Sequence, residues 1–215
     1  MPKYTGGFPT FSIEKPIALP WRGGQGYVLE VQSSGEWSAE LKLNEHRGFI
    51  TTDAKGKATF FSYRGPKANS GIVGEVLREV EQIGVPPCSV LDGGQFYRKE
   101  LGGSRLWLFD VLVWKGEKVR LPWKERRDLL DSLVPALHPT IWTPPVCWNF
   151  HKEFANMLQG KSKLIYQFLQ DHNLPPTFAD QIEGLVIKRL DGKHSFPVNK
   201  KEVSSFLKLR MADVR

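Results

Sequence analysis

Hydrophobic positions along the chain follow two spacings, and each spacing predicts a different kind of element. Runs that are apolar, or that alternate between apolar and polar residues, are typical of β-strands, because successive side chains of a strand point to opposite faces. Such runs occupy Trp37–Leu43, Gly48–Thr52, Ala58–Tyr63, Ser89–Tyr97, Arg105–Trp114, Glu183–Arg189 and Ser204–Arg210. Apolar residues three or four positions apart are typical of amphipathic helices. This spacing predicts helices over Gly71–Ile83, Lys124–Val134, Lys152–Leu158 and Lys163–Leu169.

Turn residues join several of the strand runs. Asp53-Ala54-Lys55-Gly56-Lys57 separates two of them and is typical of a hairpin, and Lys115-Gly116-Glu117 follows another. Strands joined by hairpins, with helices inserted between them, predict an α+β fold of mostly antiparallel sheets flanked by helices. Residues 135–146 are rich in proline, and we expect a loop or a strand crossing there.

Glycine and proline are frequent in the first 37 residues, which include the run Gly23-Gly24-Gln25-Gly26. This composition predicts an extended N-terminal segment over residues 1–37, packed on a single domain that spans residues 38–215.

The composition excludes several classes of protein. Of the 215 residues, 40% are hydrophobic and 12% are aromatic, which is not the composition of a disordered chain. The longest apolar stretch, Leu106–Trp114, is interrupted by Asp110 and is too short to cross a bilayer. Cys88 and Cys147 are far apart in the sequence and have no metal-ligand spacing. We therefore expect no membrane association, and a reducing cytoplasmic or nucleoid-associated location rather than secretion.

The charge balance suggests an anionic partner. Lysine and arginine number 30 against 23 acidic residues, which gives a net charge of +7. Residues 188–215 contain eight basic and three acidic residues, so this segment is the expected place for phosphate contacts. Mildly basic soluble proteins are common, however, and charge alone does not separate them from nucleic-acid-binding proteins.

Three segments carry candidate chemistry. Lys42 lies in an apolar strand run with Glu40 two positions before it, on the same strand face. A partly buried lysine loses its proton readily and becomes a nucleophile, whereas on an edge strand both residues would simply face water. Glu183 opens a second strand run, where a carboxylate can hold Mg²⁺. In a third strand run, Lys208 and Arg210 alternate with apolar residues, so both cations share one strand face. Such a pair either clamps phosphate or faces solvent.

Taken in order, these segments resemble the motifs of the covalent nucleotidyltransferase superfamily, which contains ATP-dependent DNA ligases, RNA ligases and mRNA capping enzymes. Glu40–Arg47 is similar to the K-x-D/N-G-x-R motif, whose lysine attacks the α-phosphate of ATP or GTP. Asp92-Gly93 resembles the start of the D-G-E motif, and Glu183–Lys188 the E-G-hydrophobic-V-hydrophobic-K motif. The remaining matches are Ser62–Gly65, Phe109–Leu112, Leu121–Arg127 and Lys208–Arg210.

The resemblance implies a role for each matching residue. It makes Lys42 the catalytic nucleophile and Glu183 and Asp92 the ligands of Mg²⁺ or Mn²⁺, with ATP as the nucleotide. It implies that Phe109 stacks on the purine. The residues implied to bind the nucleotide are Glu40, Leu41, Arg47, Arg64, Phe109, Lys188, Lys208 and Arg210.

Three positions depart from the family pattern. Glu45 stands where the family has glycine, and Gly94 stands where it has the glutamate of D-G-E, which contacts the ribose or metal region. Arg210 replaces the second lysine of the last motif. The sequence also ends at Arg215, directly after that motif. We therefore expect no C-terminal OB-fold domain in this chain, and a protein partner as its possible source.

The resemblance predicts an ATP-dependent polynucleotide ligase of the DNA ligase type. It would act through lysyl-AMP to join a 5′-phosphate to a 3′-hydroxyl, with nicked duplex DNA as the favoured substrate and RNA as a possible one. An RNA ligase or a GTP-using capping-type enzyme shares the same motifs. A non-catalytic nucleic-acid-binding domain is the alternative that the departures at Glu45 and Gly94 favour.

Overall fold

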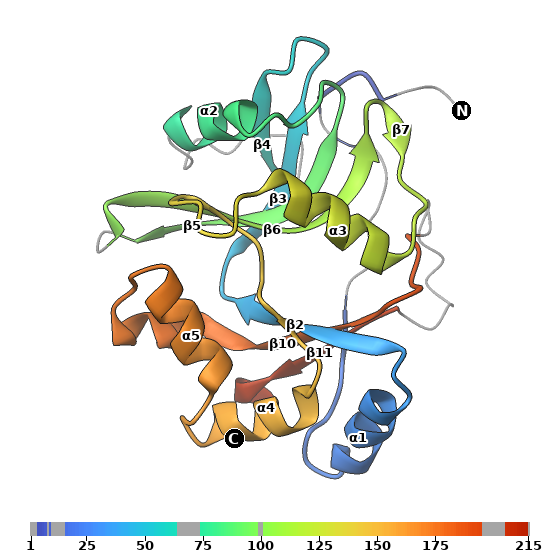
Figure 1. Cartoon of the computed structure of the whole chain (residues 1–215), viewed down its shortest axis with the longest axis vertical. Coiled ribbons are helices and arrows are strands. Elements are labelled where there is room, and N and C mark those ends of the chain that lie inside the picture. Colours follow the sequence, from blue (N-terminus) through green and yellow to red (C-terminus); the bar gives the residue numbers. More distant parts are fainter. Residues whose placement is uncertain are drawn as a thin grey trace. The chain divides into compact units, whose positions relative to one another are not determined.

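A computed structural model describes residues 4–7, 9, 16–63, 74–98, 101–194 and 205–214. The chain forms two compact units (Figure 1). The first unit comprises Met1–Phe11 and Glu45–Thr143, and the second comprises Ser12–Asn44 and Pro144–Arg215. The predicted boundary at residue 37 therefore falls inside the second unit. Among the described residues, no helix is long and apolar enough to cross a membrane.

The first unit contains a sheet with the strand order β4-β3-β5-β6-β7, and β8 pairs with β6 beside it. Every pair in this sheet is antiparallel except β6–β8. Its strands are β3 (His46–Thr52), β4 (Ala58–Ser62), β5 (Val90–Arg98), β6 (Gly103–Trp114), β7 (Glu117–Lys118) and β8 (Ile141–Trp142). Its helices are α2 (Gly74–Gln82) and α3 (Trp123–Leu133).

Helices α2 and α3 lie beside this sheet (Figure 1). Their apolar side chains pack in one core cluster with those of the sheet. Val80 of α2 and Leu130 of α3 are completely buried in the same core cluster as Leu91 of β5. The spacing that predicted two amphipathic helices therefore identifies the side chains that form the core.

A buried ion pair also fixes α3 to this sheet. Arg126 of α3 donates two hydrogen bonds to the carboxylate of Asp110 on β6, at 2.7 and 3.0 Å. The Arg126 side chain is completely buried, and that of Asp110 is 4% exposed. Removing one partner of such a pair leaves an uncompensated buried charge, so the pair ties the position of α3 to that of β6.

The second unit contains a sheet with the strand order β1-β11-β10-β2-β9. All its pairs are antiparallel except β1–β11. The strands are β1 (Ile17–Ala18), β2 (Trp37–Leu43), β9 (Val146–Cys147), β10 (Ile182–Arg189) and β11 (Phe206–Arg210). The helices are α1 (Gln25–Ser33), α4 (Phe150–Leu158) and α5 (Lys163–Asp171), with the short 3-10 helices η2 (Pro176–Gln181) and η3 (Met211–Val214).

One face of the second sheet is apolar. Leu185 of β10 lies opposite both Leu41 of β2 and Leu209 of β11, and each is at most 1% exposed. Because residues that alternate along a strand point to opposite faces, their neighbours in sequence lie on the other face.

The predicted fold class is confirmed, and the strand predictions agree with the structure to within a few residues. The hairpin between β3 and β4 is also confirmed. The Asp53 carboxylate accepts hydrogen bonds from the amides of Lys55 and Lys57, and Gly56 adopts a φ of +81°. Pro135–Val146 contains β8 and the first residue of β9, so it is a strand crossing rather than a plain loop. Of the predicted helix Gly71–Ile83, the first three residues lie outside the described part of the chain.

The prediction that residues 1–37 form an extended segment is wrong, because helix α1 lies within it. Val28 and Val31 of α1 are buried, and the preceding Trp21 ring packs on Phe154 of α4 with centroids 4.9 Å apart. The Gly23-Gly24 pair that suggested an extended chain lies in the turn directly before the helix. Tertiary packing therefore outweighs the low helix propensity of this glycine-rich sequence.

We predict that the stability of the first unit falls as the pH is lowered from about 6.5. His138 Nδ1 accepts hydrogen bonds from the amides of Thr140 and Ile141 at the start of β8. That nitrogen must therefore carry no proton, and the imidazole is neutral. Burial lowers the pKa of His138 below 6.5, against a smaller opposing effect of Glu79. The folded state then binds fewer protons than the unfolded state, and stability is lost between the unfolded and the lowered folded pKa.

Urea unfolding of the protein between pH 7.5 and pH 5 tests this prediction. His138→Asn retains an acceptor but does not titrate, so its stability should decline less over this range. His138→Ala removes the acceptor and should be less stable at every pH. An equal decline in wild type and His138→Asn would contradict the prediction.

Candidate active site

The second unit gathers seven of the predicted site residues on one sheet. In antiparallel pairs, residues directly opposite each other lie on the same face of the sheet. Lys42 of β2 lies opposite Gly184 of β10, which lies opposite Arg210 of β11. Glu40, Val186 and Lys208 form the next row. We call this surface the Lys42 face, and it consists of Ser38, Glu40, Lys42, Gly184, Val186, Lys188, Phe206, Lys208 and Arg210.

Glu183 reaches Lys42 because the ladder contains an irregularity at this point. Leu43 pairs with Ile182 and Lys42 pairs with Gly184, so Glu183 is an additional residue in β10. Such a β-bulge re-aims a side chain. The Glu183 carboxylate accepts a hydrogen bond from Lys42 Nζ at 2.5 Å. The two side chains are 22% and 32% exposed, so both stay accessible to a ligand.

Gly184 makes the bulge possible. Its φ is +151°, and a Cβ atom on it would lie 2.0 Å from the carbonyl oxygen of Leu209 on β11. Only glycine permits this backbone conformation and this close approach together. The two residues of the Glu-Gly pair therefore depend on each other. Gly184 allows the bulge, and the bulge turns the Glu183 side chain toward Lys42.

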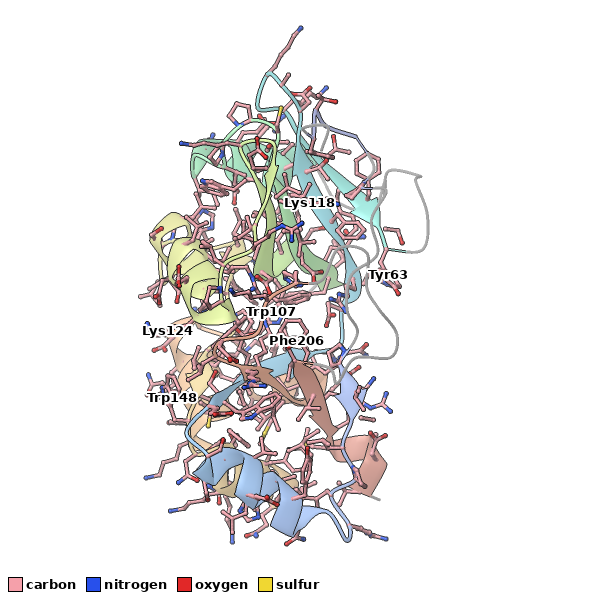
Figure 2. All side chains as sticks on the ribbon, turned by 90° about the vertical axis from the view of Figure 1, so that its right-hand side faces the viewer. Tyr63, Trp107, Lys118, Lys124, Trp148 and Phe206 are labelled. Carbon is pink, nitrogen blue, oxygen red and sulfur yellow. The ribbon has the colours of Figure 1, made fainter. Side chains whose placement is uncertain are left out.

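A second ion pair lies deeper on the Lys42 face. Lys188 Nζ is 2.6 Å from Glu40 Oε2, and the side chains are 6% and 2% exposed. The same ammonium lies 5.8 Å from the centre of the Phe206 ring, which packs in turn on His194 with ring centroids 5.6 Å apart. Figure 2 labels Phe206 on its strand. Because a buried charge is costly without its partner, each residue fixes the other in place.

The edge of the Lys42 face toward β11 is positive. Burial lowers the pKa of Lys208, and the charges of Arg210 and Lys42 lower it further. Arg210 donates hydrogen bonds to both carboxylate oxygens of Asp213, at 2.8 and 2.9 Å, and these bonds raise its pKa. Cations that lower the pKa of a neighbouring lysine create a field that favours an anion such as phosphate.

The first unit holds a separate group, the Arg47 cluster, made of Arg47, Asp92, Tyr63 and Phe109. Arg47 on β3 donates to both oxygens of Asp92 on β5, at 2.6 and 3.1 Å. The guanidinium carbon lies 5.9 Å from the centre of the Phe109 ring and 6.0 Å from that of Tyr63, which is labelled in Figure 2. Burial lowers the pKa of Arg47, but the charge and hydrogen bonds of Asp92, together with the charges of Glu45 and Tyr63, outweigh this and raise it overall.

For three predicted site residues, the structure does not test the predicted role or gives another environment. The Leu41 side chain is 1% exposed on the apolar face, so only its backbone lies beside Glu40 and Lys42. Asp92 already binds Arg47 through both oxygens, and its role as a metal ligand stays a prediction. Arg64 lies outside the described residues. In the described part of the chain, no three His, Cys, Asp or Glu side chains form a group that could hold a metal ion.

Sequence reasoning also missed two residues that shape these groups. Tyr63 lies in the matching segment Ser62–Gly65 but had no predicted role, yet its ring lies against Arg47. Arg126 lies in the matching segment Leu121–Arg127 but had no predicted role, yet it donates hydrogen bonds to Asp110, the residue next to Phe109. The charged Asp110 within a long apolar run was the signal that a buried partner must exist.

Comparison with solved structures identifies the fold. A structure named Pmar-Lig_PreS3 matches with a TM-score of 0.58 and 20% identity, over 94% of this chain and 47% of that chain. The ATP-dependent DNA ligase from bacteriophage T7, in complex with ATP, matches with a TM-score of 0.54 and 13% identity, over 90% and 67%. This chain has the nucleotidyltransferase fold of ATP-dependent ligases.

The ligase fold is shared by enzymes that act on different nucleic acids. An archaeal ATP-dependent RNA ligase matches with a TM-score of 0.50 and 16% identity, over 97% of this chain and 49% of that chain. The chain thus spans about half the length of Pmar-Lig_PreS3 and of the archaeal ligase. No protein-family model and no curated protein matches this sequence.

We predict that Gly184→Ala destabilises the protein by more than about 1 kcal/mol, because alanine does not tolerate this φ and its Cβ would meet the Leu209 carbonyl. Gly26→Ala is the matched control, since Gly26 lies in α1 and a Cβ there would meet nothing within 4 Å. The control should be neutral or slightly stabilising. Urea unfolding measures both, and equal stability of the two variants would contradict the structural role of Gly184.

Proposed function

We propose that this protein is an ATP-dependent polynucleotide ligase that works through a covalent lysyl-AMP intermediate on Lys42. The observation that carries the proposal is the Lys42 face. On a ligase nucleotidyltransferase fold, it combines an accessible lysine, a carboxylate 2.5 Å from its amine, and the cations Lys208 and Arg210. Phosphoryl transfer requires positioning and neutralisation of charge, and this face offers both.

In the first step, the neutral amine of Lys42 attacks the α-phosphorus of ATP. A nitrogen–phosphorus bond forms, the bond from the α-phosphorus to the bridging oxygen breaks, and pyrophosphate leaves. Glu183, already hydrogen-bonded to the amine, is placed to accept its proton. Lys208 and Arg210 balance the negative charge of the phosphates.

In the following steps, a nucleic-acid 5′-phosphate displaces Lys42 from AMP. A 3′-hydroxyl then attacks that 5′-phosphate and releases AMP, which seals the strand. In the Arg47 cluster, the Phe109 ring offers a flat apolar surface for the base, because aromatic faces stack on nucleobases.

A divalent cation fits the carboxylate of Glu183 better than that of Asp92. Mg²⁺ prefers oxygen ligands and in nucleotide sites is held by one or two carboxylates together with phosphate oxygens and water. Glu183 is partly exposed, whereas both Asp92 oxygens are engaged by Arg47. When bound, Mg²⁺ or Mn²⁺ would neutralise charge on the transferring phosphate.

The proposal also specifies the nucleotide and the nucleic acid on which the protein acts. We propose ATP and a nicked DNA duplex, and an RNA ligase is the second candidate because the archaeal RNA ligase shares the fold. Labelling the protein separately with radioactive ATP and GTP, followed by ligation of nicked DNA and nicked RNA duplexes, distinguishes these activities. A protein that binds nicked duplex but never carries a nucleotide would be the non-catalytic alternative.

We predict that Lys42→Ala takes up no AMP, whereas Lys124→Ala is labelled like wild type. Lys124 is an exposed lysine on α3, with 62% of its side chain exposed, and it serves as the matched control. Lys42→Arg should also fail, because a guanidinium does not lose its proton near neutral pH. Intact-mass spectrometry after incubation with ATP and Mg²⁺ measures the adduct. An AMP adduct on Lys42→Ala would disprove the assignment.

We predict that Glu183→Gln weakens the dependence of labelling on Mg²⁺, since the amide keeps the shape of the carboxylate but loses its charge. The labelling rate should reach half its maximum at a higher Mg²⁺ concentration than in wild type. Asp213→Asn is the control, because Asp213 is a carboxylate of the same unit that binds Arg210. If both variants shift the Mg²⁺ titration equally, Glu183 is not the metal ligand.

A further inference from the structure

Two departures from the ligase motifs face each other in the first unit. Glu45 stands where the resemblance expects glycine, and Gly94 stands where it expects glutamate. Glu45 directly precedes β3, and Gly94 lies on β5, which pairs with β3. Gly94 is the register partner of Arg47, two residues after Glu45. The glycine and the glutamate have therefore exchanged positions between two neighbouring strands.

The side chain of Glu45 fills the space that a side chain at position 94 would need. A Cβ atom on Gly94 would lie 2.0 Å from Cγ of Glu45, 2.9 Å from its Cβ and 3.2 Å from its Cδ. Two side chains cannot occupy that space together. Position 94 is glycine because Glu45 extends across it, and the carboxylate comes from the residue before β3 instead of from β5.

The charge balance indicates which chemical group this carboxylate suits. Glu45 is close enough to raise the pKa of Arg47, as Asp92 does more strongly. Among the described residues of this cluster, Asp92 already balances the charge of Arg47 through two hydrogen bonds, so a second carboxylate there adds no attraction for phosphate. A carboxylate accepts hydrogen bonds strongly from hydroxyl groups. The nearby Phe109 ring suits a base, so the adjoining hydroxyl-bearing group of a nucleotide is its sugar.

We propose that Glu45 accepts hydrogen bonds from the ribose hydroxyls of the bound nucleotide, in place of the glutamate missing at position 94. This inference rests on the proposed function, because it assumes that the Arg47 cluster binds a nucleotide. It removes one reason for regarding the chain as non-catalytic, since a carboxylate still lies beside the Arg47 cluster.

The test measures how strongly the protein distinguishes ATP from its 2′-deoxy and 3′-deoxy analogues. Equilibrium binding of the three nucleotides is measured in a Lys42→Ala background, where no covalent step follows. Wild-type Glu45 should favour ATP over at least one analogue. Glu45→Gln should reduce that preference about tenfold, which corresponds to one charge-assisted hydrogen bond. Glu125→Gln, an exposed carboxylate on α3 of the same unit, should leave the preference unchanged.

Variants at position 94 test the exchange itself. Gly94→Ala should displace the Glu45 side chain and reduce the preference for ATP over its deoxy analogues, as Glu45→Gln does. In the Glu45→Gln background, Gly94→Ala should cause no further loss of this preference. The double variant Glu45→Gly, Gly94→Glu should regain the preference that Glu45→Gly alone loses. Circular dichroism confirms that each variant is folded. A folded double variant that distinguishes the sugars no better than Glu45→Gly would overturn the proposal.

The outcomes separate this inference from the proposed function. Loss of affinity for all three nucleotides by the same factor in Glu45→Gln would show that Glu45 does not contact the sugar. If wild type never forms lysyl-AMP but Glu45→Gln still alters the preference among sugars, the ligase proposal fails and the role of Glu45 stands. No preference among the three nucleotides in the Lys42→Ala background would overturn the role of Glu45 irrespective of adduct formation.

Discussion

The antiparallel register that holds β10 between β2 and β11 is the constraint on which the Lys42 face depends. It brings residues from three distant segments into rows, with Glu40 and Lys208 on either side of Val186. Within it, the bulge at Glu183 turns one carboxylate toward Lys42, and Gly184 permits the close approach of β11. If β10 shifted by one residue relative to its neighbours, its polar side chains would lie on the apolar face. Burial of the leucine row therefore also fixes the register of the polar rows on the Lys42 face.

Ion pairs play two distinct roles in the two units. The Asp110–Arg126 and Glu40–Lys188 pairs are almost fully buried and act as fixed connections between elements. Lys42–Glu183 is only partly buried, so water or a ligand can replace either partner at modest cost. A side chain that changes partners during a reaction needs a partly buried ion pair of this kind. The almost fully buried pairs keep the surrounding elements in place.

Strands and hairpins were predictable because they depend on local signals, namely alternation along β2 and the turn residues at Asp53 and Gly56. The sequence also indicated that Lys42, Glu183 and Lys208 belong together, but only through their resemblance to ordered motifs. The contact between Lys42 and Glu183 joins residues 141 positions apart and depends on a bulge, which no local pattern encodes. Helix α1 was missed because its stability comes from packing against α4 rather than from its glycine-rich sequence. The exchange between Glu45 and Gly94 was visible as two separate departures, and its meaning required the pairing of β3 with β5.

The two shortest strands of the second unit have a consequence for its behaviour in solution. β1 and β9 are each two residues long, and they form the two edges of the five-stranded sheet. An exposed edge of a longer strand such as β11 or β2 would offer a row of unpaired backbone groups on which a second chain could assemble. Ile17–Ala18 and Val146–Cys147 cover part of those rows and are themselves too short to extend the sheet. Within the described part of the chain, these four residues shorten the open backbone edges at which intermolecular β-pairing could begin.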